Sequence, residues 1–244
     1  MHRFYSPDTD LTNPSVTLTD PKEIHHLKNV LRLKSGDTVA LFNGKGEEAQ
    51  AVILSVGKNA VELKILELFA SKEQTLTITL ACAIPKKARF ETIIEKTTEL
   101  GVDEIIPLIT ERTEVRIPKE KADKKSARYQ TIAINAAKQS GRIAIPRVHP
   151  PLSFKEAVDS FATPETLCVI PCLSEKNLSL ISVLQKQGKK PQRILFLIGP
   201  EGDFSKEEVA YAVKKNCLPV SLGQNVLKVD TAAISVVAFA KLFL

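Results

Sequence analysis

From Leu76 to the C-terminus, short apolar runs alternate with longer amphipathic segments, and this alternation constrains the fold more than any other feature. Nearly continuous apolar runs indicate strands buried on both faces, and the amphipathic segments between them indicate covering helices. We therefore predict an α/β domain with a mostly parallel sheet. The predicted strands cover residues 76–84, 104–109, 166–173, 193–198 and 218–222, and the predicted helices cover residues 89–100, 119–140, 153–161, 178–187, 206–216 and 231–244.

The first 70 residues have a different pattern, in which short β-prone runs follow one another closely. The pair Asn43-Gly44 favours a hairpin turn, and strands at this spacing predict a small β-barrel. The polar residues 70–75 resemble a linker, so we predict a β domain at residues 1–72 and an α/β domain at residues 73–244. The elements predicted in the first domain are a helical stretch at residues 21–31 and strands at residues 37–42, 49–56 and 60–68.

Positive charge is concentrated in the second predicted domain. Residues 1–74 carry 9 Lys+Arg against 10 Asp+Glu, whereas residues 75–244 carry 25 against 18. The excess is largest between Lys86 and Arg147, where 14 basic residues accompany 9 acidic ones. This distribution permits a polyanionic partner, and a bound RNA would find most of its positive contacts in the second domain. A solvated lysine-rich face explains any single cluster equally well.

Membrane-spanning and export segments are not evident. The longest apolar stretch, residues 232–244, is too short to cross a bilayer. The N-terminal residues 1–7 contain no apolar core of a signal peptide. We therefore expect a cytoplasmic protein without a membrane partner.

The four cysteines, Cys82, Cys168, Cys172 and Cys217, lie in apolar contexts without a CxxC pair. The four histidines do not fall at zinc-ligand spacing. We expect small buried thiols in a reducing compartment and propose no metal site.

A strand-end loop near the C-terminus is the main candidate for a ligand site. The predicted strand at residues 193–198 ends at Gly199, and a loop containing Pro200 and Gly202 leads to a helix. Ser205 and Glu208 have the spacing of a capping box at the start of that helix. Ligands of open α/β sheets bind beyond the carboxyl ends of strands, where glycine allows close approach to the backbone. A plain βα turn is the alternative interpretation.

Two other strand ends point in the same direction. The strand at residues 218–222 ends at Gly223, and Pro171 lies at the end of the strand that contains Cys168. Three such loops together would line one pocket of backbone polar groups and apolar side chains, which suits an adenosine-like ligand. The dinucleotide fingerprint GxGxxG and the P-loop spacing are absent, which disfavours a nicotinamide-dependent dehydrogenase. Asp230 or Thr231 is expected to cap the final helix.

Several motifs in this order resemble the RsmE family of SPOUT-superfamily methyltransferases. They are Arg3-Phe4-Tyr5, His25-His26-Leu27, Val30-Leu31-Arg32, Thr98-Glu99-Leu100-Gly101-Val102, Ile106-Pro107, Ala137-Lys138-Gln139-Ser140-Gly141-Arg142 with Pro146, Ile198-Gly199-Pro200-Glu201-Gly202, Ser221-Leu222-Gly223 and residues 227–232. The resemblance implies methylation of a specific uracil at N3 in 16S ribosomal RNA of the small subunit. It also implies a PUA-like β-barrel, an α/β domain with a C-terminal trefoil knot, S-adenosylmethionine (SAM) as cofactor, and a homodimer whose active site borrows from the second subunit.

The resemblance also implies roles for individual residues. Arg142 is the first choice for favouring the N3 anion, Lys228 is the second, and Glu201 would accept the proton or orient the base. RNA contacts are expected from Arg3, His26, Arg32, Arg112, Gln139, Ser140 and Arg142. The expected SAM-binding residues are Pro171, Ile198, Gly199, Pro200, Glu201, Gly202, Leu222, Gly223, Val226 and Leu227.

The chain departs from the family pattern at two places. Asp203 stands where the family usually has a second glycine, and Lys228-Val229-Asp230 stands where it usually has Arg-Thr-Glu. Lysine keeps the positive charge but not the planar fork of arginine. Two alternatives stay open, a SPOUT methyltransferase with another target nucleotide and a PUA-type RNA-binding factor without activity.

Overall fold

The computed structural model describes residues 1–70, 76–86, 89–115, 117–173, 178–186 and 190–244. The chain forms two compact units, one made of residues 1–73 and 137–145 and the other of residues 74–136 and 146–244. Residues 137–145 therefore interrupt the second unit in sequence but belong to the first by their contacts. Apart from Ala70, the predicted linker lies outside the described residues.

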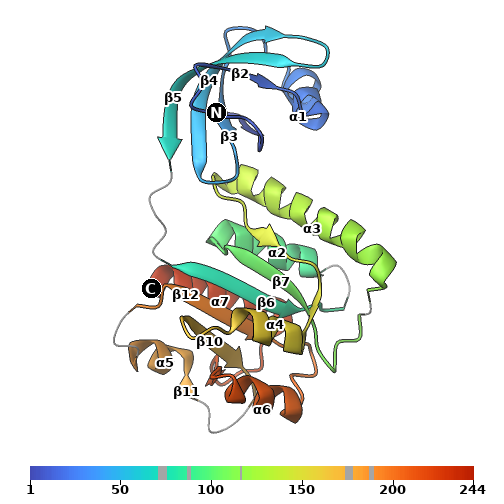
Figure 1. Cartoon of the computed structure of the whole chain (residues 1–244), viewed down its shortest axis with the longest axis vertical. Coiled ribbons are helices and arrows are strands. Elements are labelled where there is room, and N and C mark those ends of the chain that lie inside the picture. The colour runs from blue at the N-terminus through green and yellow to red at the C-terminus, as the bar shows by residue number, and fades with distance from the viewer. Residues whose placement is uncertain (71–75, 87–88, 116, 174–177, 187–189) are drawn as a thin grey trace. The chain divides into compact units, whose positions relative to one another are not determined.

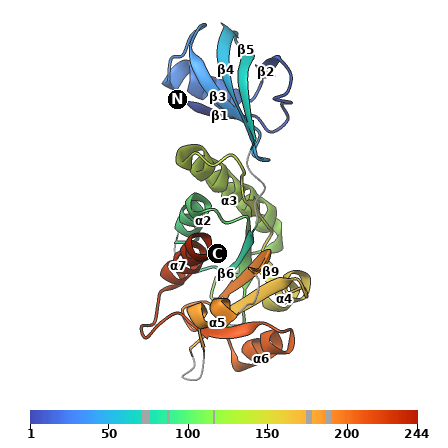
Figure 2. The same ribbon diagram turned by 90° about the vertical axis from the view of Figure 1, so that its left-hand side faces the viewer.

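The first unit contains a five-stranded sheet in the order β1-β3-β4-β5-β2. The pairing is antiparallel except between β1 and β3. The sheet is curled into a half-barrel, and its order is open among the described residues (Figure 2). The closed barrel expected from strand spacing is therefore not what the described strands form. Their bounds are β1 Arg3–Tyr5, β2 Ser15–Leu18, β3 Thr38–Phe42, β4 Glu47–Val56 and β5 Val61–Ala70.

The predicted helical stretch at residues 21–31 divides into two parts. Helix α1 covers Pro21–His25 and is capped by the Asp20 side chain, and the π-helical turn η1 covers His26–Val30. Ile24 of α1 and Leu27 of η1 are buried in the same hydrophobic core as Phe4 and Leu63 of the sheet. The hairpin predicted at Asn43-Gly44 joins β3 to β4, as its sequence indicated.

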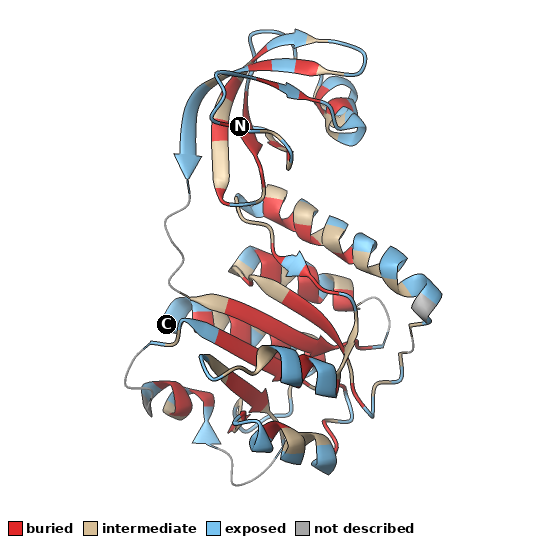
Figure 3. Cartoon of the chain, in the orientation of Figure 1, coloured by how far each residue is buried: buried red, intermediate tan, exposed pale blue. Residues whose placement is uncertain are grey.

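The second unit has a parallel sheet in the order β11-β13-β10-β12-β6-β7-β8, with β9 pairing with β7 outside this path. All of its pairings are parallel, which confirms the prediction for this domain. The central strands are buried along their length (Figure 3). The bounds are β6 Thr77–Ala83, β7 Glu104–Ile109, β8 Arg147–Val148, β9 Leu152–Ser153, β10 Thr166–Pro171, β11 Leu178–Ser179, β12 Arg193–Ile198 and β13 Leu218–Ser221.

Helices cover both faces of this sheet (Figure 1, Figure 2). Helix α7 packs on β6, β12 and α2, whereas α4 and α6 contact each other on the opposite face. The apolar stripe of α3 is buried at Tyr129, Ala133 and Ala137. Among the described residues, no helix is both long and apolar enough to cross a membrane. The bounds are α2 Arg89–Leu100, α3 Lys119–Ser140, α4 Phe154–Phe161, α5 Leu180–Lys186, α6 Lys206–Lys214 and α7 Val229–Phe243.

Two expectations about this unit are wrong. The final helix begins at Val229 with Lys228 at the N-cap, so neither Asp230 nor Thr231 caps it. Cys168 and Cys217 form a disulfide, with their Cα atoms 4.5 Å apart, and are not free thiols. The pairing follows from the parallel register of β10 and β13, in which Val169 faces Leu218 and the preceding cysteines become neighbours.

Candidate active site

Strands β10, β12 and β13 end at the same edge of the parallel sheet, and their following loops enclose one cavity. Strand β10 pairs with β12 on one side and with β13 on the other. The cavity has a volume of about 740 Å³, which lies within the range of small-molecule sites. Its lining residues are Pro171, Cys172, Leu173, Ile198, Gly199, Pro200, Glu201, Asp203, Val220, Ser221, Leu222, Gly223, Gln224, Asn225, Val226, Leu227, Val229 and Ala232.

The loop after β12 is fixed at its C-terminal end by a helix cap and a buried ring. Ser205 accepts a hydrogen bond from the Glu208 backbone, and the Glu208 carboxylate accepts one from the Ser205 backbone N–H. This arrangement confirms the predicted capping box. Phe204 is buried and packs against Phe154, with ring centroids 5.2 Å apart. A Cβ at Gly199 would lie 3.2 Å from the Phe204 ring, so a side chain there would crowd the ring and force it to shift.

Asp203 joins this loop to the one that follows β10. Its Oδ2 accepts a hydrogen bond from the Leu173 backbone N–H at 3.0 Å, and its Oδ1 accepts one from the Phe204 N–H at 2.8 Å. The backbone of Asp203 is left-handed, with φ of 60°. Glycine adopts this conformation at least cost, and aspartate is among the few other residues that tolerate it. Asp203 therefore adopts a backbone conformation that also suits glycine, and its side chain links two walls of the cavity.

Loops after β6 and β7 support the outer side of the same loop. The Arg112 guanidinium donates from Nη1 to the Gly202 carbonyl at 2.7 Å. The Glu111 backbone N–H donates to Glu208, and the Lys86 backbone N–H donates to Oε1 of Glu201 at 3.3 Å. The carboxylate of Glu201 is therefore oriented by the end of the neighbouring strand.

The charged residues among the described cavity lining are both acidic. They are Glu201 and Asp203. Burial raises the pKa of the Cys82 thiol at the end of β6, and the negative charges of Asp230 and Glu201 raise it further. Asp230 therefore lies near the same strand ends as Glu201. A cationic ligand is therefore favoured here over a phosphate-bearing one.

The third wall is the segment between β13 and α7. The Ser221 hydroxyl donates to the Gly223 carbonyl at 3.0 Å and accepts from the Gly223 N–H at 3.2 Å, and Gly223 has φ of 133°. Val226 is 74% exposed although it lines the cavity. An apolar side chain held at a cavity mouth in this way offers surface to a ligand.

The predicted SAM-binding residues all line the cavity except Gly202, whose carbonyl faces Arg112. Of the three predicted catalytic residues, Glu201 lines the cavity and Lys228 is an exposed neighbour of Leu227 and Val229. Arg142 belongs to the first unit. The predicted RNA contacts Arg3, His26, Arg32, Gln139 and Ser140 also belong to the first unit, whereas Arg112 belongs to the second.

Sequence reasoning missed several lining residues. Five of them adjoin predicted SAM-binding residues, so extending each predicted segment by one residue would have found them: Cys172, Asp203, Ser221, Gln224 and Asn225. The others lie further along the chain and reach the cavity only through the fold: Leu173, Val220, Val229 and Ala232. Within the described part of the chain, no group of three or more His, Cys, Asp or Glu side chains has a metal-binding arrangement.

Two family models match successive parts of the chain. A model described as an RNA methyltransferase domain matches residues 72–241. A model described as an RNA methyltransferase PUA domain matches residues 18–66.

Individual relatives are similar over nearly the whole chain. A ribosomal RNA small subunit methyltransferase E of Synechocystis is 35% identical over 95% of this chain and 74% of its own length. A protein of the same name from Bacillus subtilis is 31% identical over 91% of this chain and 87% of its own length. The crystal structure of a ribosomal RNA small subunit methyltransferase E from Neisseria gonorrhoeae, bound to SAM, superposes with a TM-score of 0.86. It is 32% identical and covers 98% of this chain and 95% of its own.

Proposed function

Because this chain belongs to the ribosomal RNA small subunit methyltransferase E family, we propose that it transfers the methyl group of SAM to N3 of one uridine in 16S ribosomal RNA. The observation that carries this proposal is the cavity enclosed by the loops after β10, β12 and β13. In this proposal the PUA-like residues 1–72 bind RNA and residues 73–244 bind SAM. The substrate is made and assembled in the cytoplasm, which is the proposed compartment.

The residues of the cavity fit SAM in charge and shape. SAM carries a sulfonium and an ammonium group, and Glu201 and Asp203 place negative charge on the cavity wall. The loops offer backbone N–H and C=O groups beside apolar side chains, which is the combination that adenosine recognition requires. The proposed SAM-binding residues are Pro171, Ile198, Gly199, Pro200, Glu201, Gly202, Leu222, Gly223, Val226 and Leu227.

The chemistry places two demands on the chain's own residues. The activated methyl group is supplied by the sulfonium of SAM, so the protein must align the uracil and assist loss of the N3 proton. Because N3 lies on the Watson–Crick edge, the base must be unpaired or flipped out. We assign Arg142 to stabilise negative charge on the uracil carbonyl oxygens, with Lys228 as the second choice. Glu201 is assigned to accept the proton or to hold the base.

Arg142 belongs to the first unit and the cavity to the second. We propose a homodimer in which the active site is completed by residues of the second subunit. Exposed positions in the first unit, including Arg32, Gln139 and Ser140, are proposed RNA contacts together with His26 and Arg112.

We further propose that the C-terminal part of the second unit is tied in a trefoil knot. Strand β13 lies on the far side of β10 from β12, yet α7, which follows it, packs on β12 and β6. Cys172 and Leu173, which follow β10, and residues 222–227, which follow β13, line the same cavity. In this proposal the second segment passes through the loop that the first one forms, as a knot requires, and such an arrangement is exceptional among folds.

The decisive experiment compares Arg142→Ala with Arg147→Ala, a matched removal of an exposed arginine on β8. Small-subunit RNA from a deletion strain is methylated in vitro and its 3-methyluridine is quantified by mass spectrometry. We expect Arg142→Ala to lose methylation while calorimetry shows SAM binding close to that of the unaltered protein. Normal methylation by Arg142→Ala would remove that residue from the mechanism. Absence of SAM binding in the unaltered protein would favour an inactive RNA-binding factor, and a different methylated base would favour another target nucleotide.

A further inference from the structure

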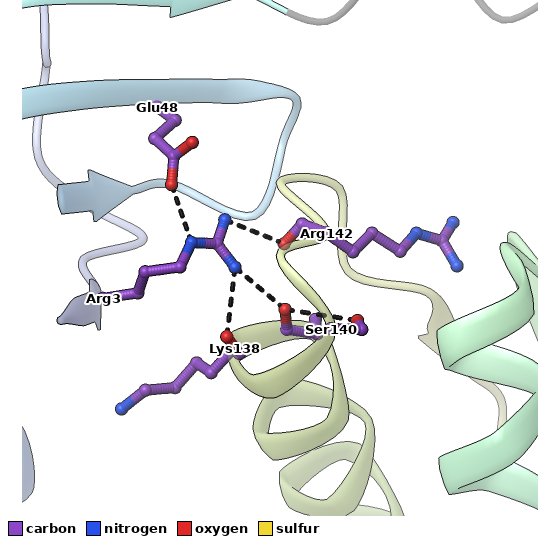
Figure 4. A network of polar contacts seen from close by, with 6 residues as sticks. Arg3, Glu48, Lys138, Ser140 and Arg142 are labelled. Atoms are coloured by element: carbon purple, nitrogen blue, oxygen red, sulfur yellow. Dashed lines mark hydrogen bonds and ion pairs between the residues drawn. The ribbon is translucent and has the colours of Figure 1, made fainter. Parts of the chain in front are cut away.

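Arg3, at the start of β1, uses its guanidinium inside the first unit (Figure 4). Its Nε donates to Oε1 of Glu48 at 2.7 Å. Nη1 donates to the carbonyls of Ala137 and Lys138 at 3.0 and 3.2 Å, and Nη2 donates to the carbonyl of Arg142 at 3.3 Å. The side chain is 13% exposed. Because Nε, Nη1 and Nη2 all donate hydrogen bonds within the protein, the guanidinium has little capacity left to bind a phosphate.

The three carbonyls belong to the end of helix α3 and the turn that follows it. Gly141 has φ of 79°, and the Arg142 N–H donates to the Ala137 carbonyl at 3.0 Å. This is the Schellman arrangement, in which a left-handed glycine ends the helix. The last carbonyls of a helix lack the donors that the helix interior would supply. Arg3 adds donors to Ala137, to Lys138 and to the carbonyl of Arg142 in the turn, from a strand 134 to 139 residues earlier in the sequence.

Other contacts tie the same segment to the first unit. Lys138 Nζ lies 2.7 Å from both carboxylate oxygens of Glu23 on α1. On the other side of the turn, the Ile145 N–H donates to the Gly44 carbonyl at 2.9 Å. A Cβ at Gly44 would lie 2.8 Å from Ile145 and 2.8 Å from Tyr5, so close approach of the two segments requires this glycine. The β3–β4 hairpin and α1 therefore hold the two ends of residues 137–145, and Arg3 holds the turn between them.

The backbone of Arg142 is held, while its side chain extends away from Arg3 (Figure 4). The Arg3–Glu48 pair is neutral overall and fixes the turn through hydrogen bonds to its carbonyls. A planar fork that donates to several acceptors at once is a property of arginine that lysine lacks.

We propose that Arg3 is a positioning residue that holds the turn at residues 139–142 in the geometry needed for methyl transfer, and that it is not an RNA ligand. The inference rests on the proposed function of Arg142 and replaces the RNA contact expected of Arg3 from the sequence. The N-terminal unit then contributes to catalysis by shaping this turn, in addition to any grip on the substrate.

The test uses the full-length chain and the variants Arg3→Ala and Arg3→Lys, with Lys64→Ala on β5 as the matched loss of a positive charge in the same unit. We expect both Arg3 variants to lower kcat by roughly 10- to 100-fold, as for a misplaced catalytic group. The KM for RNA and the Kd for SAM should change less than about twofold. Restoration of kcat by Arg3→Lys would overturn the proposal, because a phosphate contact needs only the charge.

The salt dependence of RNA binding separates the two roles directly. The slope of log K against log salt is negative, and the loss of one phosphate contact on single-stranded RNA makes it less steep by about 0.7. We expect the slope of Arg3→Ala to equal that of the unaltered protein. A reduced slope together with a raised KM for RNA would assign Arg3 to the substrate and overturn the positioning role.

Hydrogen exchange gives a readout that does not depend on activity. In Arg3→Ala, peptides covering residues 137–145 should exchange faster, while peptides covering residues 199–205 should be unchanged. If Arg3→Ala does not fold, Glu48→Gln takes its place, because it keeps Arg3 and removes only its carboxylate partner; the same changes are expected at smaller size. If hydrogen exchange at residues 137–145 were the same in Arg3→Ala as in the unaltered protein, the positioning role would be overturned, even if Arg142 proved essential for methylation. An active Arg142→Ala enzyme would instead overturn the proposed catalytic role of Arg142 and leave the exchange result standing.

Discussion

The Asp203 carboxylate accepts a hydrogen bond from the Leu173 backbone N–H at 3.0 Å and so connects two walls of the candidate SAM cavity. The two residues are 30 positions apart and follow different strands, β12 and β10. A cavity whose walls are linked before the ligand arrives loses less conformational freedom on binding. The position is also strained, because the backbone of Asp203 is left-handed.

Replacement of Asp203 tests this link. Asp203→Gly removes both side-chain hydrogen bonds, worth ~1 kcal/mol each, and relieves left-handed strain of ~1 kcal/mol. The melting temperature should therefore fall by only about 2–4 °C, while calorimetry shows SAM binding about three- to tenfold weaker. Asp203→Asn keeps an acceptor and tolerates the conformation, so it should bind SAM within about twofold of the unaltered chain. Unweakened binding by Asp203→Gly would show that the link does not shape the cavity.

A side chain at Gly199 is expected to destabilise the fold by crowding Phe204. In Gly199→Ala the new methyl group would lie 3.2 Å from the Phe204 ring, which is itself packed on Phe154. Overpacking of this kind costs ~1–3 kcal/mol, so the melting temperature without ligand should fall by several degrees. Gly202→Ala is the matched control for stability, because its methyl group would lie 3.6 Å from Arg112, at ordinary contact distance. Equal melting temperatures for the two variants would contradict the crowding argument.

The Glu104–His149 pair predicts a pH dependence of stability. Oε2 of Glu104 lies 2.6 Å from Nε2 of His149, and this hydrogen bond lowers the pKa of Glu104 against the opposing effect of burial. Because the folded pKa lies below the unfolded one, the unfolded chain binds more protons between the two values. The stabilisation that the Glu104–His149 pair contributes is therefore present above the unfolded pKa of about 4.3, and it is lost as the pH falls through the pKa of Glu104 in the folded protein.

Urea unfolding at a series of pH values, with Glu104→Gln for comparison, measures this contribution. The difference in unfolding free energy between the two proteins should shrink as the pH falls below about 4. A difference that is constant with pH would show that the pair does not act through this proton.

The Cys168–Cys217 disulfide gives a fourth prediction. Without reductant, the unfolded chain should contain two titratable thiols, from Cys82 and Cys172. Cys217→Ser should lower the free energy of unfolding by ~2–4 kcal/mol, because the cross-link restricts the unfolded chain. With reductant present the variant and the unaltered protein should differ by much less. Four thiols in the unfolded chain before reduction would contradict the pairing.

Elements defined by a local pattern could be predicted closely. The helices expected at residues 89–100 and 119–140 and the strands expected at residues 104–109 and 193–198 have those bounds in the structure. The strands that were missed, β1, β2, β8, β9 and β11, are two to four residues long. Such segments are too short to show a period, and they become strands because a neighbouring strand offers hydrogen bonds.

The features of the candidate site also divide into those that a local pattern predicts and those that depend on the fold. The loop at Gly199–Gly202 and the capping box at Ser205 and Glu208 depend on residues within one turn of each other, so the sequence contains their signal. Arg112 is a proposed RNA contact, and in the structure its guanidinium donates to the Gly202 carbonyl 90 residues away. The sequence indicates only its positive charge, and the fold decides which carbonyl of the chain that charge meets.

Local patterns were enough to predict the α/β alternation, the glycine-ended loops and the order of motifs that indicates the family. The alternation and the caps depend on periodicities and hydrogen bonds that act over three or four residues. The three-dimensional fold was needed to show that Asp203 links to Leu173, that Cys168 pairs with Cys217, and that Arg3 holds the turn at Arg142. Each of these pairs joins residues 30 to 139 positions apart, and its formation depends on the register of strands and the return path of the chain, which no local pattern encodes.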